Sequence, residues 1–291
     1  MAYKTINEMI TVTPVSPYVG AEISDIDLTQ PLPDSQIAQL RDAFARHGVL
    51  FFRDQEISFD DHLRLASYIG PLERHVGIWN ATNTTENPLV RKMHYDETSE
   101  LISGERFHSD QTCNAIPPLA TVLYLHTVPP NGGGDTIFGS MYAAYDALSP
   151  HMKSYLGKLT ATHDGTRTFG PGKPVSVHPV IIRHPVTGKN VIFVNPIHTS
   201  HINDVPRLES DRILQYVYDH CANETWQYRF RWQPHSIAFW DNRCLSHKAV
   251  WDYWPAVRSG YRVQLEATEA PVPGDASPEV IGKKSWLATY K

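Results

Sequence analysis

The tripeptide His108-Ser109-Asp110, taken with a distant histidine, constrains this chain more than any other feature. Two histidines and one carboxylate are the protein ligands of the facial triad that holds non-haem Fe(II) and leaves other positions open. Because residues two apart on a strand point the same way, a strand across His108 and Asp110 would present both side chains to one face. His247 lies far downstream, so a fold that uses this triad must place two distant segments side by side.

A pair of arginines follows the distant histidine. Arg258 and Arg262 are four residues apart, so on a strand both would face the interior. An unpaired cation is costly there, and a buried arginine pair therefore indicates buried anions. Guanidinium forks suit carboxylates and sulfonates. Each arginine offers a binding site for one anion. A metal site beside both arginines could therefore accommodate two acidic small molecules.

Each of these residues also has an ordinary structural interpretation. The chain has 15 histidines, so a lone histidine–x–aspartate tripeptide arises easily by chance. The two arginines could form surface ion pairs, although Tyr253 and Tyr261 beside them favour burial. We prefer the metal interpretation because His108, Asp110 and His247 occur together with both arginines.

Composition limits the kinds of partner. The 291 residues carry a formal net charge of −5 and contain no basic stripe, so we expect no nucleic-acid or membrane partner. The start of the chain lacks an apolar signal segment, and no apolar run reaches the roughly 18 residues that a membrane span needs. Three widely spaced cysteines, Cys113, Cys221 and Cys244, form no CxxC pair. We expect buried thiols in a reducing, cytoplasmic compartment.

Hydrophobic periodicity predicts many short strands with scattered helices. Helices are expected over 34–47, 58–69, 141–155 with a break near Pro150, and 207–220. Strands are expected over 49–52, 121–126, 159–163, 179–183, 191–194, 228–232, 236–240 and 261–266. The chain shows no internal repeat, and we expect a single domain over 1–291. This pattern is typical of a β-rich α+β fold with two packed sheets or a jelly roll.

Two segments stand outside this pattern. Residues 71–105 are polar and rich in Asn and Thr, which makes a long connection for a compact domain. We expect this segment to be a lid over the active site, with His75 at its hinge. The proline-bearing tail, 271–291, is expected to be peripheral.

Several further motifs follow one another in a specific order. They are Val19-Gly20-Ala21-Glu22-Ile23, Phe107-His108-Ser109-Asp110, Gly133-Gly134-Asp135-Thr136, His184-Pro185-Val186-Thr187-Gly188, Arg231-Trp232-Gln233-Pro234 and Trp240-Asp241-Asn242-Arg243. With them, the chain resembles the taurine dioxygenase (TauD/TfdA) family of Fe(II)- and 2-oxoglutarate-dependent dioxygenases over nearly its whole length. The resemblance implies a double-stranded β-helix, a jelly-roll core with flanking helices. It also implies Fe(II), 2-oxoglutarate and O2 as cofactor and cosubstrates, and a homo-oligomer, either a dimer or a tetramer.

The same resemblance implies roles for the metal and cosubstrate residues. His108, Asp110 and His247 would be the iron ligands. Thr136 and Arg258 would hold the distal carboxylate of 2-oxoglutarate. Thr136 could instead only end a turn after three glycines, because threonine commonly bonds its own backbone there.

Substrate-binding roles are implied as well. Arg262 and His75 would receive the acidic end of the primary substrate, although His75 could equally be an exposed loop histidine. Thr168 and Phe169 would line the pocket. Gln111, directly after the metal motif, is a further candidate for substrate contact.

The chain departs from the taurine-using members at the opposite end of the pocket. Gly104 stands where they have an asparagine, and Ile78, beside Trp79, stands where they have a tyrosine. His198 replaces a pocket phenylalanine. The anion end of the pocket is therefore kept and the ammonium end is lost, so we expect taurine itself to be a poor substrate.

The leading prediction is a dioxygenase that hydroxylates a small sulfonate, sulfate ester, or aryloxy or alkyl carboxylate. Succinate and CO2 would be co-products, and collapse to an aldehyde or ketone would release sulfite, sulfate or a phenol. A halogenase of this mechanism would need the Asp110 position vacant. One alternative is a biosynthetic hydroxylase or desaturase of an amino-acid-like acid, with Asp96 or Glu97 gripping the ammonium group. Another is a non-catalytic jelly roll that binds a metal and small acids, which would require a lost ligand or arginine.

Overall fold

The largest element of the fold is an eight-stranded sheet. The computed structural model describes residues 9–74 and 83–274, and within them no helix has the length and apolar character needed to cross a membrane. The strand order is β1 (Thr11–Pro14), β2 (Ala21–Ser24), β3 (Val49–Phe52), β14 (Ser236–Asp241), β6 (Ala120–Thr127), β16 (Arg258–Leu265) and β4 (Leu72–Glu73), with β5 (Arg91–Tyr95) also paired to β16.

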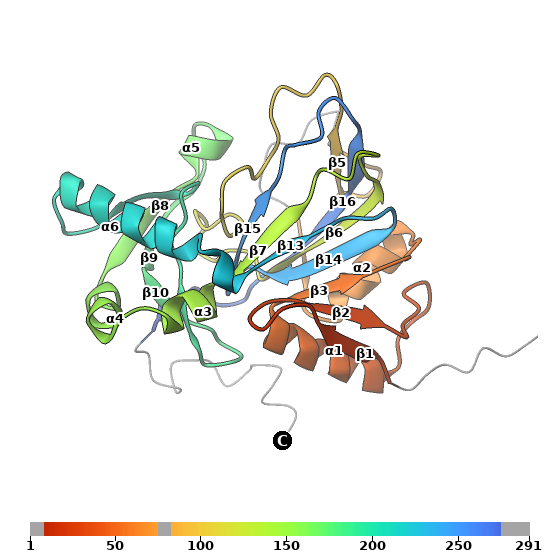
Figure 1. The fold of residues 1–291 in the computed structure, drawn as a ribbon, viewed down its shortest axis with the longest axis horizontal. Helices are drawn as coiled ribbons and strands as arrows, with labels where there is room; N and C mark the ends of the chain where they lie inside the picture. Colours follow the sequence, from red (N-terminus) through yellow and green to blue (C-terminus); the bar gives the residue numbers. More distant parts are fainter. Residues whose placement is uncertain (1–8, 75–82, 275–291) are drawn as a thin grey trace, which may run out of the picture.

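Two helices cover the outer face of this sheet near its β1–β3 edge (Figure 1). Helix α1 (Asp34–His47) buries Leu40 and Phe44 against the sheet residues Leu50 and Phe239. It ends at Gly48, where φ is 72° and glycine has no steric penalty. Helix α2 (Phe59–Ser67) begins at a capping box formed by Ser58 and Asp61.

A smaller sheet faces the large one across the core. It consists of β13 (Gln227–Phe230), β7 (Thr136–Ser140) and β15 (Leu245–Ala249). Aromatic side chains fill the space between the sheets. Phe51 stacks on Phe230 with ring centroids 4.1 Å apart, and Phe138 lies 5.6 Å from Trp240. This packing of two β faces with flanking helices confirms the predicted β-rich α+β class.

The remaining elements form a lobe beside the small sheet (Figure 1). One sheet joins β12 (Thr199–Ile202), β8 (Thr160–Asp164) and β9 (Val175–Pro179), and another joins β11 (Asn190–Ile192), β10 (Ile181–Arg183) and β17 (Val272–Pro273). The helical elements here are α3 (Met141–Asp146), α4 (Pro150–Leu156), α5 (Thr166–Phe169), α6 (Arg207–Cys221) and η1 (Glu224–Trp226). The helix expected over 141–155 is divided in two, because Ser149 caps a new helix that has Pro150 in its first turn.

A strand across His108 and Asp110, which would have presented both side chains to one face, does not form. His108 forms only an isolated bridge with His247, and Asp110 begins a turn in which Gln111 has a φ of 47°. Strand alternation therefore does not set the direction of the two side chains. Turn geometry brings them together instead.

The segment 71–105 is also more ordered than a plain connection. Leu72–Glu73 pairs with one end of β16, and Arg91–Tyr95 runs antiparallel to the other end. The intervening residues 75–82 lie outside the described part of the chain. The β16 ladder uses the backbone groups of β5, so a strand forms here despite the polar sequence around it.

Candidate metal and anion site

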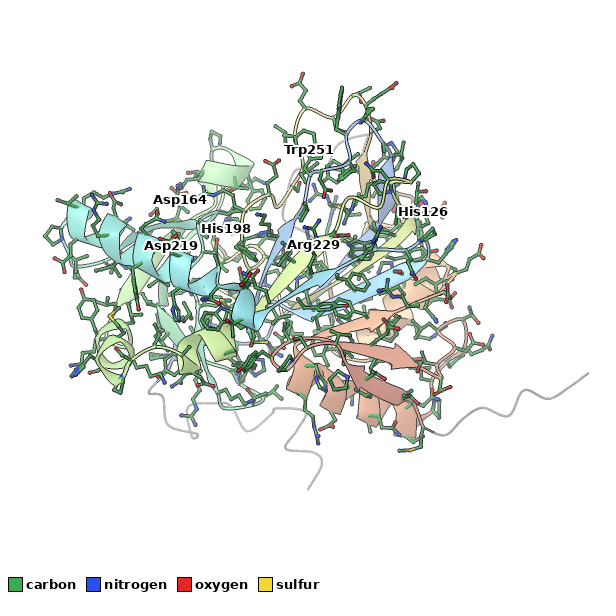
Figure 2. The ribbon with its side chains drawn as sticks, viewed as in Figure 1. His126, Asp164, His198, Asp219, Arg229 and Trp251 are labelled. Carbon is green, nitrogen blue, oxygen red and sulfur yellow. The ribbon has the colours of Figure 1, made fainter. Side chains whose placement is uncertain are left out.

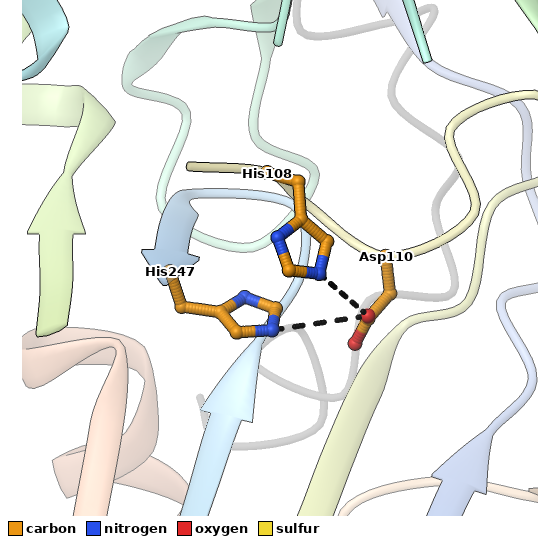
Figure 3. A group of neighbouring side chains, drawn as sticks. All are labelled: His108, Asp110 and His247. Carbon is orange, nitrogen blue, oxygen red and sulfur yellow. Dashed lines mark ion pairs between the residues drawn. The ribbon is translucent and has the colours of Figure 1, made fainter. Parts of the chain in front are cut away.

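Three buried side chains converge where β15 meets the turn that follows β5. His108 and His247 exchange two backbone hydrogen bonds, of 3.0 and 2.8 Å, which fix the two segments side by side. Asp110 Oδ1 lies 3.6 Å from His108 Nε2 and 3.8 Å from His247 Nε2 (Figure 3). One donor atom from each residue falls within 4.8 Å of the other two, a spacing that suits a single metal ion.

The protonation states of the three groups also fit a metal. His108 Nδ1 lies 2.9 Å from the carbonyl oxygen of Arg106, which can only accept, so this nitrogen carries the proton. Nε2 is therefore the nitrogen left to face the site. Burial and the neighbouring His108 lower the pKa of His247 well below its ordinary value, so the His247 ring is neutral. Burial alone would raise the pKa of Asp110, but Arg262 and the two histidines hold it well below the usual range.

The other carboxylate oxygen of Asp110, Oδ2, is bound by side chains outside the three-residue group. Asp110 Oδ2 accepts a 2.8 Å hydrogen bond from the Thr121 hydroxyl and pairs with Arg262 Nη2 at 2.5 Å. Thr121 Oγ1 in turn accepts from Asn242 Nδ2 at 3.1 Å, and Asn242 Oδ1 accepts from Trp240 Nε1 at 2.9 Å. This chain of contacts orients the carboxylate so that Oδ1 faces the histidines.

A cavity adjoins the three residues. Its lining residues are Met93, Tyr95, Ile102, Ser103, Gly104, His108, Leu123, Thr136, Trp240, His247, Ala249, Val250, Tyr253, Arg258 and Arg262. The wall thus combines apolar side chains with two guanidinium groups and the hydroxyl-bearing side chains of Tyr95, Ser103, Thr136 and Tyr253, as expected for a site that orients small molecules through a few polar contacts.

Arg258 and Thr136 meet on one side of this cavity. Arg258 is 5% exposed, and its Nε donates to the carbonyl oxygen of Gly134 at 3.0 Å. Within residues 9–74 and 83–274, it forms no ion pair with a carboxylate. Thr136 Oγ1 accepts from Trp232 Nε1 at 3.0 Å, so its own proton is available to donate. A buried cation beside a hydroxyl donor is suited to an organic carboxylate.

Two other predicted residues lie away from the cavity wall. Gln111 is buried and donates through Nε2 to Gln264 Oε1 at 2.7 Å, so the turn after Asp110 uses its amide structurally. His198, labelled in Figure 2, directly precedes β12. It is 2% exposed, and burial together with His108 lowers its pKa to about 4.

Thr168 and Phe169 belong to the short helix α5 rather than to the wall of the described cavity. Thr168 is exposed. Phe169 packs against the His198 ring with centroids 5.5 Å apart. The three remaining predicted positions, His75, Ile78 and Trp79, lie outside the described residues.

Gly104, in contrast, does line the cavity. Its φ is +85°, and a Cβ atom built there would lie 2.8 Å from His108 Cε1. Both the backbone conformation and the nearby ring therefore require glycine. An asparagine like that of the taurine-using enzymes would not fit on this backbone.

Sequence reasoning missed several cavity residues, among them Met93 and Tyr95 of β5 and Leu123 of β6. The alternation of Arg91, Met93 and Tyr95 was the available signal for β5. It was obscured by the preceding run rich in Asn and Thr, which is typical of a loop.

A second buried cluster, His184, Asp241 and Cys244, also has metal-like spacing. Here the donor atoms are already engaged. His184 Nδ1 accepts from the backbone nitrogens at 186 and 187, and its Nε2 lies 3.1 Å from Asp241 Oδ2. Arg243 binds the same carboxylate through Nε and Nη2. This cluster holds the turn between β14 and β15 and so supports the strand that carries His247.

Comparison with known proteins gives a consistent result. The family described as "Taurine catabolism dioxygenase TauD, TfdA family" matches residues 11–264. A putative alpha-ketoglutarate-dependent sulfonate dioxygenase of Schizosaccharomyces pombe is 33% identical over 271 residues, covering 85% of this chain and 67% of that protein. The alpha-ketoglutarate-dependent 2,4-dichlorophenoxyacetate dioxygenase of Cupriavidus pinatubonensis is 26% identical, with coverage of 82% and 91%.

The fold has a similarly close counterpart among solved structures. A putative alpha-ketoglutarate-dependent taurine dioxygenase from Burkholderia xenovorans superposes with a TM-score of 0.83 at 33% identity. The match covers 92% of this chain and 96% of that one. The likeness confirms the predicted jelly-roll fold.

Proposed function

Because the chain belongs to the TauD/TfdA family, we propose which of its residues carry the Fe(II)- and 2-oxoglutarate-dependent chemistry of that family. The protein is a dioxygenase that uses Fe(II), 2-oxoglutarate and O2 and acts on a small anionic substrate. The observation that carries the assignment is the convergence of two imidazoles and one carboxylate beside a cavity with two buried arginines.

His108, Asp110 and His247 are the proposed iron ligands. The hydrogen bond that engages Nδ1 of His108 and leaves Nε2 facing the site, the neutral ring of His247 and the ionised Asp110 carboxylate support this role. Two imidazoles and one carboxylate leave further coordination positions open. When bound there, the iron centre supplies O2 activation coupled to conversion of 2-oxoglutarate into succinate and CO2.

Arg258 and Thr136 are proposed to bind the distal carboxylate of 2-oxoglutarate. The charge of Arg258 is buried without a carboxylate partner in the described part of the chain, and the Thr136 hydroxyl can donate beside it. A 2-oxoglutarate carboxylate would supply the missing anion. These two residues would thereby orient the cosubstrate relative to the metal ligands.

For the primary substrate we propose a sulfonate, sulfate ester, or aryloxy or alkyl carboxylate. Met93, Ile102 and Leu123 give the cavity an apolar wall, and Arg262 supplies a cation. Hydroxylation next to the leaving group would give an aldehyde or ketone and release sulfite, sulfate or a phenol. We propose that taurine is a poorer substrate, because Gly104 leaves no side chain to hold its ammonium group.

An amino-acid-like substrate has less support. The expected ammonium-binding candidates were Asp96 and Glu97. Asp96 Oδ1 accepts from the hydroxyl of Thr98, and Oδ2 lies 3.2 Å from His94. Neither acid lines the cavity within the described residues.

We also propose a single domain over 1–291 and a cytoplasmic homo-oligomer, either a dimer or a tetramer. Three buried, unpaired cysteines suit a reducing compartment. The segment 71–105 is proposed as a lid, and β5 supports this by lining the cavity. The tail 271–291 is proposed to be peripheral; within it, Val272–Pro273 pairs with β10.

Anaerobic titration tests the site. Purified apoprotein mixed with Fe(II) and 2-oxoglutarate should develop a visible charge-transfer band, which shifts when a suitable substrate enters. His108→Ala should abolish the band, whereas Arg258→Gln should raise the 2-oxoglutarate concentration that it requires. A wild-type protein without the band, or a His108→Ala variant that retains it, would refute the assignment.

A further inference from the structure

Strands β5 and β16 form a ladder along one wall of the site. In register, Tyr95 lies opposite Arg258, and Arg91 lies opposite Arg262. Directly opposed residues of an antiparallel pair share a face of the sheet, and so do residues two apart on one strand. Tyr95 and Met93 line the cavity. Arg91 therefore continues the same row beside Arg262, directly beyond the residues that line the cavity.

The register sets Arg91 beside Arg262, and its charge interacts with two groups of the proposed iron site. Burial and the charge of Arg262 lower the pKa of Arg91 to about 10, while the Asp110 carboxylate acts in the opposite direction. At neutral pH the group is still protonated. Two guanidinium groups thus stand side by side near one carboxylate, an arrangement that favours an additional anion.

Arg262 has hydrogen-bonding capacity left for such an anion. Its Nη2 is engaged with Asp110 Oδ2 and with Thr121 Oγ1. Its Nε, however, is buried with no hydrogen-bond partner in residues 9–74 and 83–274. An unmet buried donor on a cation is costly, so an acceptor from a ligand would be strongly favoured there.

The local charge balance agrees. Even without Arg91, the buried Arg258 and Arg262 against Asp110 leave one positive charge in excess, counting one charge per group. A divalent metal and a 2-oxoglutarate dianion cancel each other. The site loaded with both therefore retains a positive excess that a substrate anion can neutralise.

We propose that Arg91 is a second substrate-binding cation, and that Arg91 and Arg262 together grip the anionic head group of the substrate. A sulfonate or sulfate ester carries three terminal oxygens and can accept from two guanidinium groups at once. A carboxylate has only two oxygens, and the second arginine therefore favours sulfur oxyanions. This inference rests on the proposed function and adds a selectivity-determining residue to it.

Variants of Arg91 test the proposal against a matched control. Lys92 is the adjacent cation, pairs in register with Tyr261, and points to the opposite face of β5. Arg91→Gln and Lys92→Gln thus remove the same charge from opposite faces. The probes are 1-hexanesulfonate and heptanoate, titrated anaerobically into protein loaded with Fe(II) and 2-oxoglutarate, with the shift of the charge-transfer band as the signal.

Arg91→Gln should raise the Kd of hexanesulfonate on the order of tenfold, the usual scale for one charge-assisted hydrogen bond. The Kd of heptanoate should rise less, Lys92→Gln should leave both constants unchanged, and Arg91→Lys should recover part of the loss. The band before the probe is added should keep its 2-oxoglutarate dependence in every variant. Unchanged secondary-structure circular dichroism confirms that the variants fold.

The possible outcomes distinguish a failure of the proposed function from a failure of the role proposed for Arg91. If wild type shows no band, the proposed function fails and this inference fails with it. A normal band with Arg91→Gln binding hexanesulfonate as tightly as Lys92→Gln overturns the role of Arg91 alone. Equal weakening of both probes supports the second cation but overturns its selectivity for sulfur oxyanions.

Discussion

At the scale of single residues, the proposed metal site depends on side chains outside the proposed ligand set. Thr121 donates to Asp110 Oδ2 and accepts from Asn242, so one hydroxyl links the proposed ligand to the buried end of β14. Groups of this kind orient a ligand and tune its basicity. The motif itself does not reveal them, because Thr121 lies on β6, outside the motif.

Thr121→Val removes this hydroxyl while keeping the shape of the side chain. Metal affinity should fall about 10-fold or more, since loss of such a supporting contact typically costs 10–100-fold. Calorimetric titration of the apoprotein with Co(II) measures the change. Thr121→Ser, which restores the hydroxyl, should return most of the affinity, and a valine variant with wild-type affinity would contradict the orienting role.

Gly104 gives a second prediction at this scale. Gly104→Ala introduces a Cβ at a φ of +85° and 2.8 Å from His108 Cε1. The matched control is Gly172→Ala, whose φ is +77° but which has nothing within 4 Å. Both substitutions carry the backbone cost of about 1–2 kcal/mol, but only Gly104→Ala should also weaken Co(II) binding. Equal Co(II) affinities in the two variants would show that the ring tolerates the methyl group.

At the scale of elements, β16 is the strand on which the site depends most. Its central position joins β6 on one side and β4 with β5 on the other. Gly260 allows this close packing, because a Cβ there would overlap the backbone oxygen of Tyr124. The two arginines four residues apart are thus held on one face by a strand with neighbours on both edges.

Glu73, on β4 beside β16, predicts that the stability of the fold depends on pH. Burial, reinforced by Glu266, raises the pKa of Glu73 to about 7 from its ordinary 4.5. The folded state therefore holds this proton more tightly than the unfolded chain. The resulting stability is present below about pH 4.5 and is lost as pH rises through about 7.

Glu73→Gln should consequently unfold at a higher temperature than wild type at pH 8 and lose that advantage at pH 4.5. Thermal unfolding followed by circular dichroism across this range measures the difference. The exposed Glu100 is the control, since Glu100→Gln should follow wild type throughout. A pH-independent difference between Glu73→Gln and wild type would rule out titration of Glu73.

At the scale of the whole molecule, the facing sheets bring together the proposed site residues from distant parts of the chain. His247 lies on the small sheet, the turn after His108 carries Asp110, and both arginines lie on the large sheet. The aromatic core that includes Phe138 and Trp240 separates the sheets by a fixed distance. The cavity opens where this core ends.

Ligand binding should therefore stabilise the whole fold. Saturating Co(II) and 2-oxoglutarate bind only the folded protein, and about 100-fold excess over Kd corresponds to about 2.7 kcal/mol for each ligand. Thermal unfolding should show one increase in Tm when Co(II) is added and a second when 2-oxoglutarate follows, both under anaerobic conditions. Arg258→Gln should keep the increase from the metal and lose most of the one from 2-oxoglutarate; retention of both would remove Arg258 from the cosubstrate site.

Local sequence patterns predicted much of the scaffold. The 34–47 helix matches its expected bounds because an apolar stripe and a stop glycine are local signals. The 49–52 strand was predicted equally well. The motif residues His108, Asp110 and His247 do come together in the structure, and their role as iron ligands stays a prediction based on which atoms can bind iron. Whether a strand crosses His108 and Asp110 could not be told from the motif, because a bridge to His247 and a turn decide that geometry.

The sequence by itself therefore determined the fold class, the donor atoms and the charge of the site. Only the tertiary structure decided that Arg262 contacts Asp110, that Thr121 supports the same carboxylate, and that Arg91 stands beside Arg262. The physical reason is that donor chemistry belongs to a residue, whereas contacts between strands far apart in sequence depend on register and packing.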